Sequence, residues 1–246
     1  MRYVSLVRHG EYTPTPSGGE LTARGRRQAA ATGKRLAKRG GRADATNATD
    51  ATALYTLHAS TMSRAMESAS IIGSHLSVDV GPGHDYLRES IPTGVPGHRV
   101  SLEARRKGRE RVDTIVAKHL RPTPRPMHDV HDVLVCHGNM IRAVVAVALR
   151  ARLTTWVDMF IHHGSLTQLV VLDDGRVVLR HYNDIGHFTP RLVTSSFTKS
   201  GLSGGSKNKP QDGDKNGIRA TSKSRTPNPG RKKGKKDRSK KSRGEA

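Results

Sequence analysis

Two segments that lie far apart in the chain share one pattern, in which a short β-prone run ends at a His-Gly pair. Residues 3–7 lead into Arg8-His9-Gly10, and residues 133–136 lead into His137-Gly138. The second run is apolar and unbroken, which is typical of a strand buried on both faces of a parallel sheet. The carboxyl ends of parallel strands meet at one edge of a sheet, so we expect His9 and His137 to emerge together there.

The segments between these runs carry helix and turn signals. Helices are predicted from Arg26 to Ala37 after a Thr22 N-cap, from the caps Ser60 and Thr61 to about His75, from Ser101 to Leu120, and after Asn139. A strand is predicted at 53–59, and Asp173-Asp174-Gly175 predicts a hairpin between residues 166–172 and 177–182. Strands thus alternate with helices over most of residues 1–185. This order predicts an α/β fold, a three-layer sandwich with a mostly parallel central sheet.

Apolar spacing also predicts which side of the helix at 101–120 faces the core. The side chains expected on that inner side are Leu102, Val112, Ile115, Val116 and Leu120.

Charge divides the 246 residues into two parts. The formal net charge is +22, and residues 199–246 hold 16 basic and 4 acidic residues but no aromatic one. Such a segment has almost nothing to bury and cannot offset its chain entropy by packing. We therefore predict a catalytic domain at residues 1–198 and a disordered Lys/Arg-rich tail at residues 199–246.

Cysteine content and hydropathy bear on the compartment. Cys136 is the single cysteine, residues 1–7 are too short an apolar run for a signal peptide, and Arg142 interrupts the longest apolar stretch, Met140 to Leu149. We expect a cytoplasmic protein without a membrane anchor. The basic run at residues 231–243 predicts a polyanion or a nuclear import receptor as a partner, and a nuclear location through that tail.

The predicted strand ends collect residues that suit phosphoryl transfer. Arg8 and Arg64 can grip phosphate oxygens bidentately, and the helix after His137 presents backbone N–H groups to an anion. A neutral imidazole is a competent nucleophile toward phosphorus, and Glu89 can protonate the leaving oxygen and then activate water. Each piece alone is weak evidence, but the ordered set at strand ends favours phosphoryl transfer.

The sequence resembles the histidine phosphatase superfamily, whose fold is that of phosphoglycerate mutase and whose signature is Arg8-His9-Gly10. Within it, the chain is similar to the branch of the mitochondrial phosphoglycerate-mutase-like serine/threonine protein phosphatase. The segments that carry this resemblance are 21–40, 58–76, 87–92, 135–142, 163–180 and 183–194.

The resemblance implies a role for each residue of the set. His9 would accept the phosphoryl group, Glu89 would be proton donor and later general base, and Arg8, Arg64 and His137 would bind the phosphoryl group and stabilise its transition state. It implies no cofactor and no metal. The substrate it implies is a phosphorylated protein, with a small phosphomonoester as the alternative.

The chain also departs from that branch, which carries a membrane anchor and a Trp-rich multimerisation motif before its catalytic domain. Here the first strand begins at residue 3 and Trp156 is the single tryptophan, so mitochondrial anchoring and large oligomers are not expected, while a homodimer stays open. The 47 residues between Glu89 and His137 leave little room for the substrate-covering insertions of a mutase. We therefore favour a serine/threonine protein phosphatase over a small-molecule phosphatase or a phosphoglycerate mutase.

Three other interpretations compete with this one. Cys136 and Arg142 satisfy the Cys-x5-Arg spacing of cysteine-dependent phosphatases, although we expect a buried Cys136 at a strand end. Residues 128–132 offer metal ligands, but a solvated polar loop is the preferred interpretation, and His162-His163 is expected to be a strand-edge pair. The last rival is a nucleic-acid-binding protein that acts through its basic tail.

Overall fold

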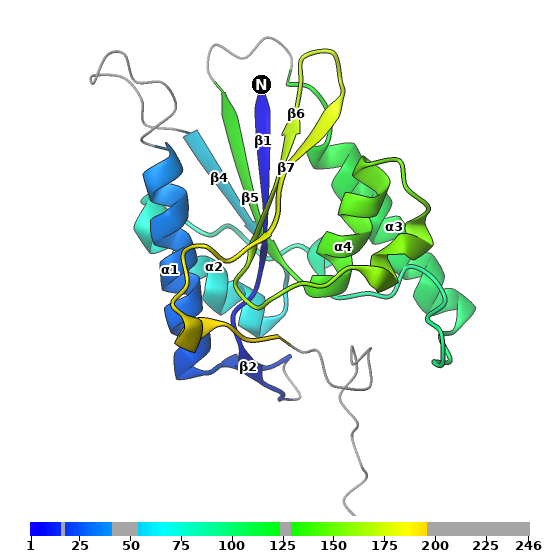
Figure 1. Ribbon diagram of the computed structural model, residues 1–246, viewed down its shortest axis with the longest axis horizontal. Coiled ribbons are helices and arrows are strands. Elements are labelled where there is room, and N and C mark those ends of the chain that lie inside the picture. Colours follow the sequence, from blue (N-terminus) through cyan, green and yellow to red (C-terminus); the bar gives the residue numbers. More distant parts are fainter. Residues whose placement is uncertain (16–17, 41–53, 124–128, 196–246) are drawn as a thin grey trace, which may run out of the picture. The chain divides into compact units, whose positions relative to one another are not determined.

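The computed structural model describes residues 1–15, 18–40, 54–123 and 129–195 (Figure 1). The strands are β1 (Arg2–Arg8), β2 (Tyr12–Thr13), β3 (Glu20–Leu21), β4 (Leu54–Ala59), β5 (Val130–Cys136), β6 (Leu166–Val171) and β7 (Val177–Asp184). The α-helices are α1 (Ala23–Gly40), α2 (Ser63–Leu76), α3 (Leu102–His119) and α4 (Gly138–Ala148), and the 3-10 helices are η1 (Asp85–Leu87), η2 (Leu153–Asp158) and η3 (Pro190–Leu192). The predicted tail at 199–246 lies outside the described residues.

The central sheet has five strands in the order β4-β5-β1-β6-β7. Strands β4, β5 and β1 are parallel, β6 runs antiparallel to β1, and β7 runs antiparallel to β6 and so points the same way as β1. The predicted α/β fold with a mostly parallel sheet is therefore confirmed. The hairpin predicted at Asp173-Asp174-Gly175 is also present, between β6 and β7.

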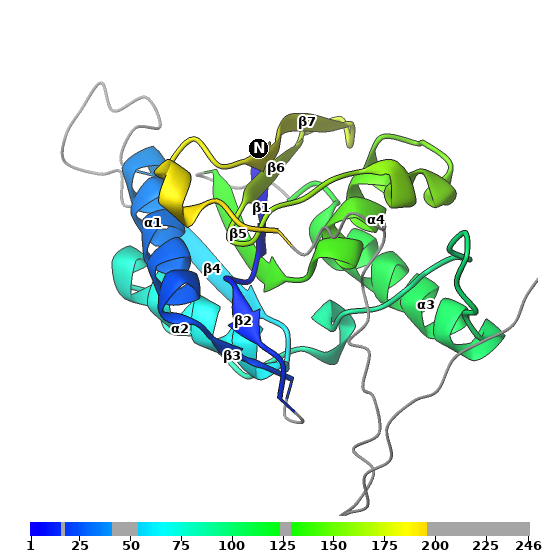
Figure 2. The ribbon, with the colours of Figure 1, turned by 60° about the horizontal axis from the view of Figure 1, so that its bottom comes forward.

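Helices cover both faces of this sheet, as Figure 2 shows, with α1 and α2 on one side and α3 and α4 on the other. Side chains alternate along each strand, so one strand serves two cores. Leu6 and Leu134 belong to the core under α3 and α4, whereas Val7 and Val135 belong to the core under α1 and α2. Within the described residues, no helix is long and apolar enough to cross a membrane.

The predicted helix starts are right for two helices and wrong for one. The Thr22 hydroxyl accepts a hydrogen bond from the Gly25 N–H at 3.0 Å, and the Ser101 hydroxyl accepts one from Ala104 at 3.1 Å. Both are N-caps. Helix α2 instead begins at Ser63 after an extended Met62, because Ser60 and Thr61 still belong to the turn that leaves β4.

Two further expectations were wrong. The segment expected to be a solvated loop is strand from Val130 onward, and Asp132 is buried, because β5 pairs with β1 and β4 over its whole length. Leu102 was expected to face the core but is 77% exposed, and it is the first residue of α3.

The two sides of α3 should therefore differ in their contribution to stability. Ile115 is fully buried in the core, so Ile115→Ala should lower the free energy of unfolding by about 2–5 kcal/mol through lost contacts and a cavity. Leu102→Ala, on the same helix, should change it by less than about 0.5 kcal/mol. Urea unfolding followed by circular dichroism measures both, and equal losses would contradict this assignment of the buried side.

Candidate active site

The register of the parallel strands places the predicted site residues at one edge of the sheet. Arg8 on β1 is paired with Cys136 on β5, so the next residues, His9 and His137, leave the sheet side by side. Their ring centroids lie 5.1 Å apart. Ser60 follows β4 at the same edge, and the turn after it delivers Arg64 in the first turn of α2.

His9 is buried, and its hydrogen bonds define which nitrogen is available for chemistry. Its Nδ1 lies 2.8 Å from the Gly10 carbonyl oxygen, which can only accept, so Nδ1 carries the proton. Its Nε2 accepts a hydrogen bond from Arg64 Nε at 3.0 Å. Burial, then His137, Arg8 and Arg64, lower the pKa of His9 well below its ordinary value. His9 is thus a neutral imidazole whose Nε2 lone pair points into the site.

Arg64 links three parts of the site. Besides His9, its guanidinium donates to His137 Nδ1 at 3.1 Å and to the Gly18 carbonyl oxygen. It also lies over the Tyr12 ring, 4.5 Å from the centroid. His137 in turn places its Nε2 2.8 Å from the Ser60 hydroxyl, and burial lowers the pKa of His137 well below its ordinary value. His137 is therefore also neutral.

Arg8 enters the site from the end of β1 and is buried. It donates to the Ile161 carbonyl oxygen at 2.8 Å and to His163 Nε2 at 3.0 Å. Burial lowers its pKa to about 10, so the guanidinium stays charged at neutral pH. Burial and the neighbouring Arg8 lower the pKa of His163 to about 2, which makes His163 a third neutral imidazole.

The electrostatic result is a site with excess positive charge. The hydrogen bonds just described join Arg8 and Arg64 to carbonyl oxygens and neutral imidazoles, and the carboxyl of Glu89 acts on both guanidiniums as an opposite charge. Helix α4 starts directly after His137 and adds the positive end of its dipole. This arrangement suits a doubly charged anion such as a phosphoryl group.

Glu89 is the one predicted site residue that stands apart from the hydrogen-bonded group. It follows η1, and its Oε1 accepts a hydrogen bond from the Ser90 N–H at 3.3 Å. Burial raises the pKa of Glu89, although Arg8, Arg64 and Arg142 act in the opposite direction. A carboxyl with a raised pKa that is electrostatically coupled to the guanidiniums of Arg8 and Arg64 has the chemistry of a proton donor.

The loop after β1 needs a glycine at position 10, directly after His9. A Cβ on Gly10 would lie 2.4 Å from the Gly25 carbonyl oxygen, and a Cβ on Gly25 would lie 2.0 Å from the Glu11 carbonyl oxygen. The two backbones are therefore in contact, which seats the loop on the start of α1. This contact fixes the backbone directly after His9.

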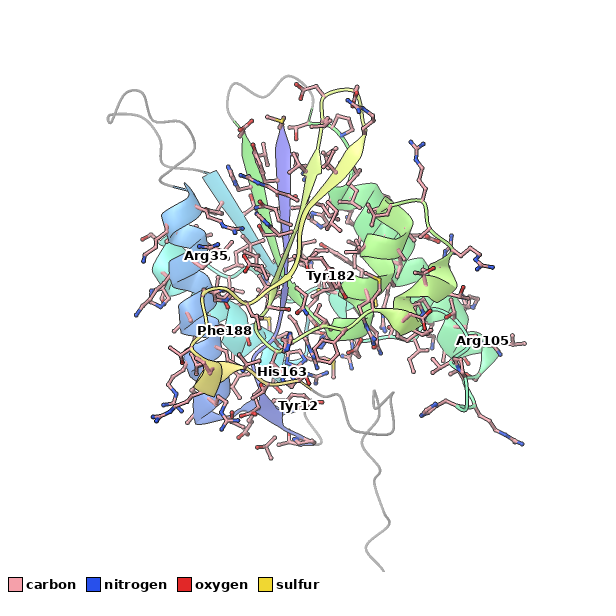
Figure 3. The ribbon with its side chains drawn as sticks, in the orientation of Figure 1. Tyr12, Arg35, Arg105, His163, Tyr182 and Phe188 are labelled. Atoms are coloured by element: carbon pink, nitrogen blue, oxygen red, sulfur yellow. The ribbon has the colours of Figure 1, made fainter. Side chains whose placement is uncertain are left out.

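The structure adds residues that the sequence interpretation missed. His163, expected at a strand edge, lies 5.7 Å from His9 between ring centroids and touches Arg8, because β6 runs antiparallel and begins where β1 ends. Figure 3 shows His163 and Tyr12 near one another at this end of the sheet. Ser60 and Arg142 also belong to these surroundings, although the sequence suggested Ser60 only as a helix cap and Arg142 only as part of the Cys-x5-Arg pattern.

The alternative nucleophile, Cys136, lies in the core instead of the site. It is buried at the end of β5, and burial raises the pKa of its thiol to about 12. The thiol is therefore protonated and weakly nucleophilic at neutral pH.

Comparison with known proteins agrees with this geometry. The sequence profile of the histidine phosphatase superfamily (branch 1) matches residues 4–90. The chain is 34% identical over 208 residues to the mitochondrial serine/threonine-protein phosphatase Pgam5 of Caenorhabditis briggsae, covering 80% of this chain and 67% of that protein. It is 32% identical to mitochondrial PGAM5 of Homo sapiens over 203 residues, covering 79% of this chain and 66% of that protein.

Solved structures give the same fold. A phosphoglycerate mutase from Plasmodium falciparum superposes with a TM-score of 0.51 at 26% identity, covering 74% of this chain and 89% of that one. A mycobacterial glucosyl-3-phosphoglycerate phosphatase in complex with inorganic phosphate superposes with a TM-score of 0.55 at 21% identity, covering 77% of this chain and all of that one.

Proposed function

The chain belongs to the histidine phosphatase superfamily, and we propose that it removes phosphate from phosphoserine and phosphothreonine in proteins through a phosphohistidine at His9. It is homologous to PGAM5-type serine/threonine-protein phosphatases, and this homology fits an enzyme that hydrolyses phosphoric monoesters. The observation that carries the proposal is the neutral His9, whose Nε2 accepts a hydrogen bond from the charged guanidinium of Arg64.

In the first step, the phosphoryl oxygens accept hydrogen bonds from Arg8 and Arg64, and the hydrogen bond from Arg64 to His9 Nε2 breaks. Nε2 then attacks phosphorus, the P–O bond to the serine or threonine oxygen breaks, and protonated Glu89 gives its proton to that oxygen. The N–H groups of Arg8 and Arg64 stabilise the charge on the equatorial oxygens.

In the second step, Glu89 is a carboxylate and takes a proton from water. The water oxygen attacks phosphorus, the P–N bond breaks, and inorganic phosphate leaves with His9 neutral again. His137 stays between Arg64 and Ser60 and orients the guanidinium, while burial keeps His137 itself neutral. No step needs a metal.

Substrate class can be tested by kinetics. A panel of phosphoserine and phosphothreonine peptides, small phosphate esters and 2,3-bisphosphoglycerate should give the highest kcat/KM for the peptides. A clear preference for a small ester would move the assignment to a small-molecule phosphatase, and a preference for 2,3-bisphosphoglycerate would move it to a mutase.

Two variants serve as the controls of this panel. His9→Ala should abolish turnover of every ester, because no nucleophile remains, whereas Cys136→Ala should keep turnover near the wild-type level. Loss of activity in Cys136→Ala together with normal activity in His9→Ala would overturn the proposed mechanism.

The raised pKa of Glu89 predicts a specific pH dependence. An ordinary carboxyl loses its proton near pH 4, while this one keeps it to higher pH, so kcat/KM on phosphoserine should fall as pH rises through the raised pKa. Glu89→Gln should lower kcat/KM by about 10²–10⁴-fold and remove this alkaline limb. With p-nitrophenyl phosphate, whose leaving group needs no proton, the variant should instead show a burst and accumulate phosphohistidine.

If the wild type and Glu89→Gln showed the same fall in kcat/KM at high pH, the titration would belong to another group. An absent burst, with both steps slowed equally, would mean that Glu89 positions the substrate and does not transfer protons.

The tail gives a separate proposal, which rests on composition. We propose that residues 231–243 bind a polyanion or a nuclear import receptor through Lys and Arg. Affinity for double-stranded DNA, measured by fluorescence anisotropy, should fall steeply with salt and vanish when residues 199–246 are removed. Binding that survives the truncation would contradict this role.

A further inference from the structure

A second group of histidines lies apart from His9, between β4, η1 and α3. His58 is on β4, His84 directly precedes η1, and His119 is the last residue of α3. Their neighbour Asp132, on β5, is paired with Thr56 of β4 and projects to the same face of the sheet as His58. This group, His58, His84, His119 and Asp132, takes no part in the chemistry proposed above.

The carboxylate of Asp132 determines how His119 is oriented. Asp132 Oδ2 accepts hydrogen bonds from His119 Nδ1 at 3.0 Å and from Arg2 Nε at 2.9 Å. The Nδ1 of His119 therefore carries a proton, and its Nε2 lies 3.2 Å from the Tyr86 hydroxyl. A carboxylate behind a histidine in this way is the usual second shell of a metal-bound imidazole.

The other two histidines are spaced as two ligands of one metal ion. His58 Nδ1 and His84 Nε2 lie 3.3 Å apart, which is long for a hydrogen bond. Two Zn–N bonds of about 2.0–2.1 Å at the tetrahedral angle place their nitrogens about 3.3 Å apart. The ring centroids of His58 and His119 are 5.0 Å apart, and ligand atoms of His58, His119 and Asp132 all lie within 4.8 Å of one another.

We propose that His58, His84 and His119 bind one divalent transition metal ion, with Zn²⁺ as the best match, and that Asp132 holds His119 in place from behind. Three imidazoles are a ligand set that suits Zn²⁺, and the partly exposed His84 and Tyr86 leave the fourth position open to solvent. Binding displaces the Tyr86 hydroxyl from His119 Nε2.

The imidazoles of His58 and His84 would bind the ion as neutral groups, through their nitrogen lone pairs. The charged neighbours are Asp132, which Arg2 neutralises at 2.7 Å, and Lys118, whose Nζ lies 5.8 Å from the Tyr86 ring.

The ion would fasten three elements together near the active site. His84 N–H is bonded to the Ala59 carbonyl oxygen at 2.7 Å, and Glu89 follows two residues after η1. A metal that joins His84 to β4 and α3 therefore fixes the start of the segment that carries Glu89. Its role is structural, because it lies outside the group formed by His9, Arg64 and His137.

Metal binding to the full-length, tag-free, chelator-treated protein tests the proposal directly. Calorimetry with Zn²⁺ should show about one tight site per chain, and Co²⁺ should give the visible absorption bands of a tetrahedral complex. His58→Gln and His84→Gln should abolish both signals, and Asp132→Asn should weaken Zn²⁺ binding by about 10–100-fold. Zn²⁺ should raise the Tm of the wild type but not that of His58→Gln.

Matched controls separate this site from other histidines. His131→Gln, on the opposite face of β5 where the ring stacks on Tyr3, should bind Zn²⁺ like the wild type. Circular dichroism and hydrolysis of p-nitrophenyl phosphate by the metal-free variants show that they are folded.

No Zn²⁺ binding by the wild type, or unchanged binding by folded His58→Gln and His84→Gln, would overturn the proposal. Binding lost in His137→Gln but kept in His58→Gln would place the metal at the catalytic imidazoles and would also overturn it. The catalytic proposal is independent of either outcome, because it rests on the His9→Ala result.

Discussion

The Arg64 guanidinium is bonded at once to His9, to His137 and to the Gly18 carbonyl oxygen, and these bonds tie three chain segments into one site. Arg64 stands at the start of α2, while the two histidines end neighbouring strands. The buried face of α2, with Ala65, Ala69 and Ile72, seats the helix against the sheet and so keeps the guanidinium within reach. The core on this side of the sheet thereby serves the geometry of the site.

Neutral imidazoles around charged guanidiniums are what suit the site to an anion. On α3, Arg106 and Arg109 face carboxylates four residues onward, and such exposed pairs compensate their own charge. Arg8 and Arg64 are instead buried among carbonyl oxygens and histidines, with the carboxyl of Glu89 acting on both. The formal charge of the chain, +22, is therefore a poor measure of the site, since two placed guanidiniums in a buried setting matter more than the sum.

Much of the site could be predicted because its residues follow a local rule. A side chain directly after a parallel strand lies at the carboxyl edge of the sheet, and this places His9 and His137 without any knowledge of strand order. Arg64 follows by the same rule, one turn after β4. Glu89 was inferred from its neighbours in sequence, and its electrostatic coupling to Arg8 and Arg64 is consistent with that inference. The prediction that Leu102 is buried was wrong because apolar spacing near a helix end does not say whether the helix still covers the sheet there.

The sequence by itself determined the α/β class and the strand ends, and so predicted that His9, Arg64 and His137 lie at one edge of the sheet, because periodicity and strand-end position are encoded over a few neighbouring residues. Only the tertiary structure decided that His163 reaches Arg8, since that contact depends on β6 running antiparallel beside β1. It also decided that His58, His84 and His119 form one cluster. Their contacts join a strand, a loop and a helix end, and no fixed spacing along the chain can encode a distance that the packing of three elements sets.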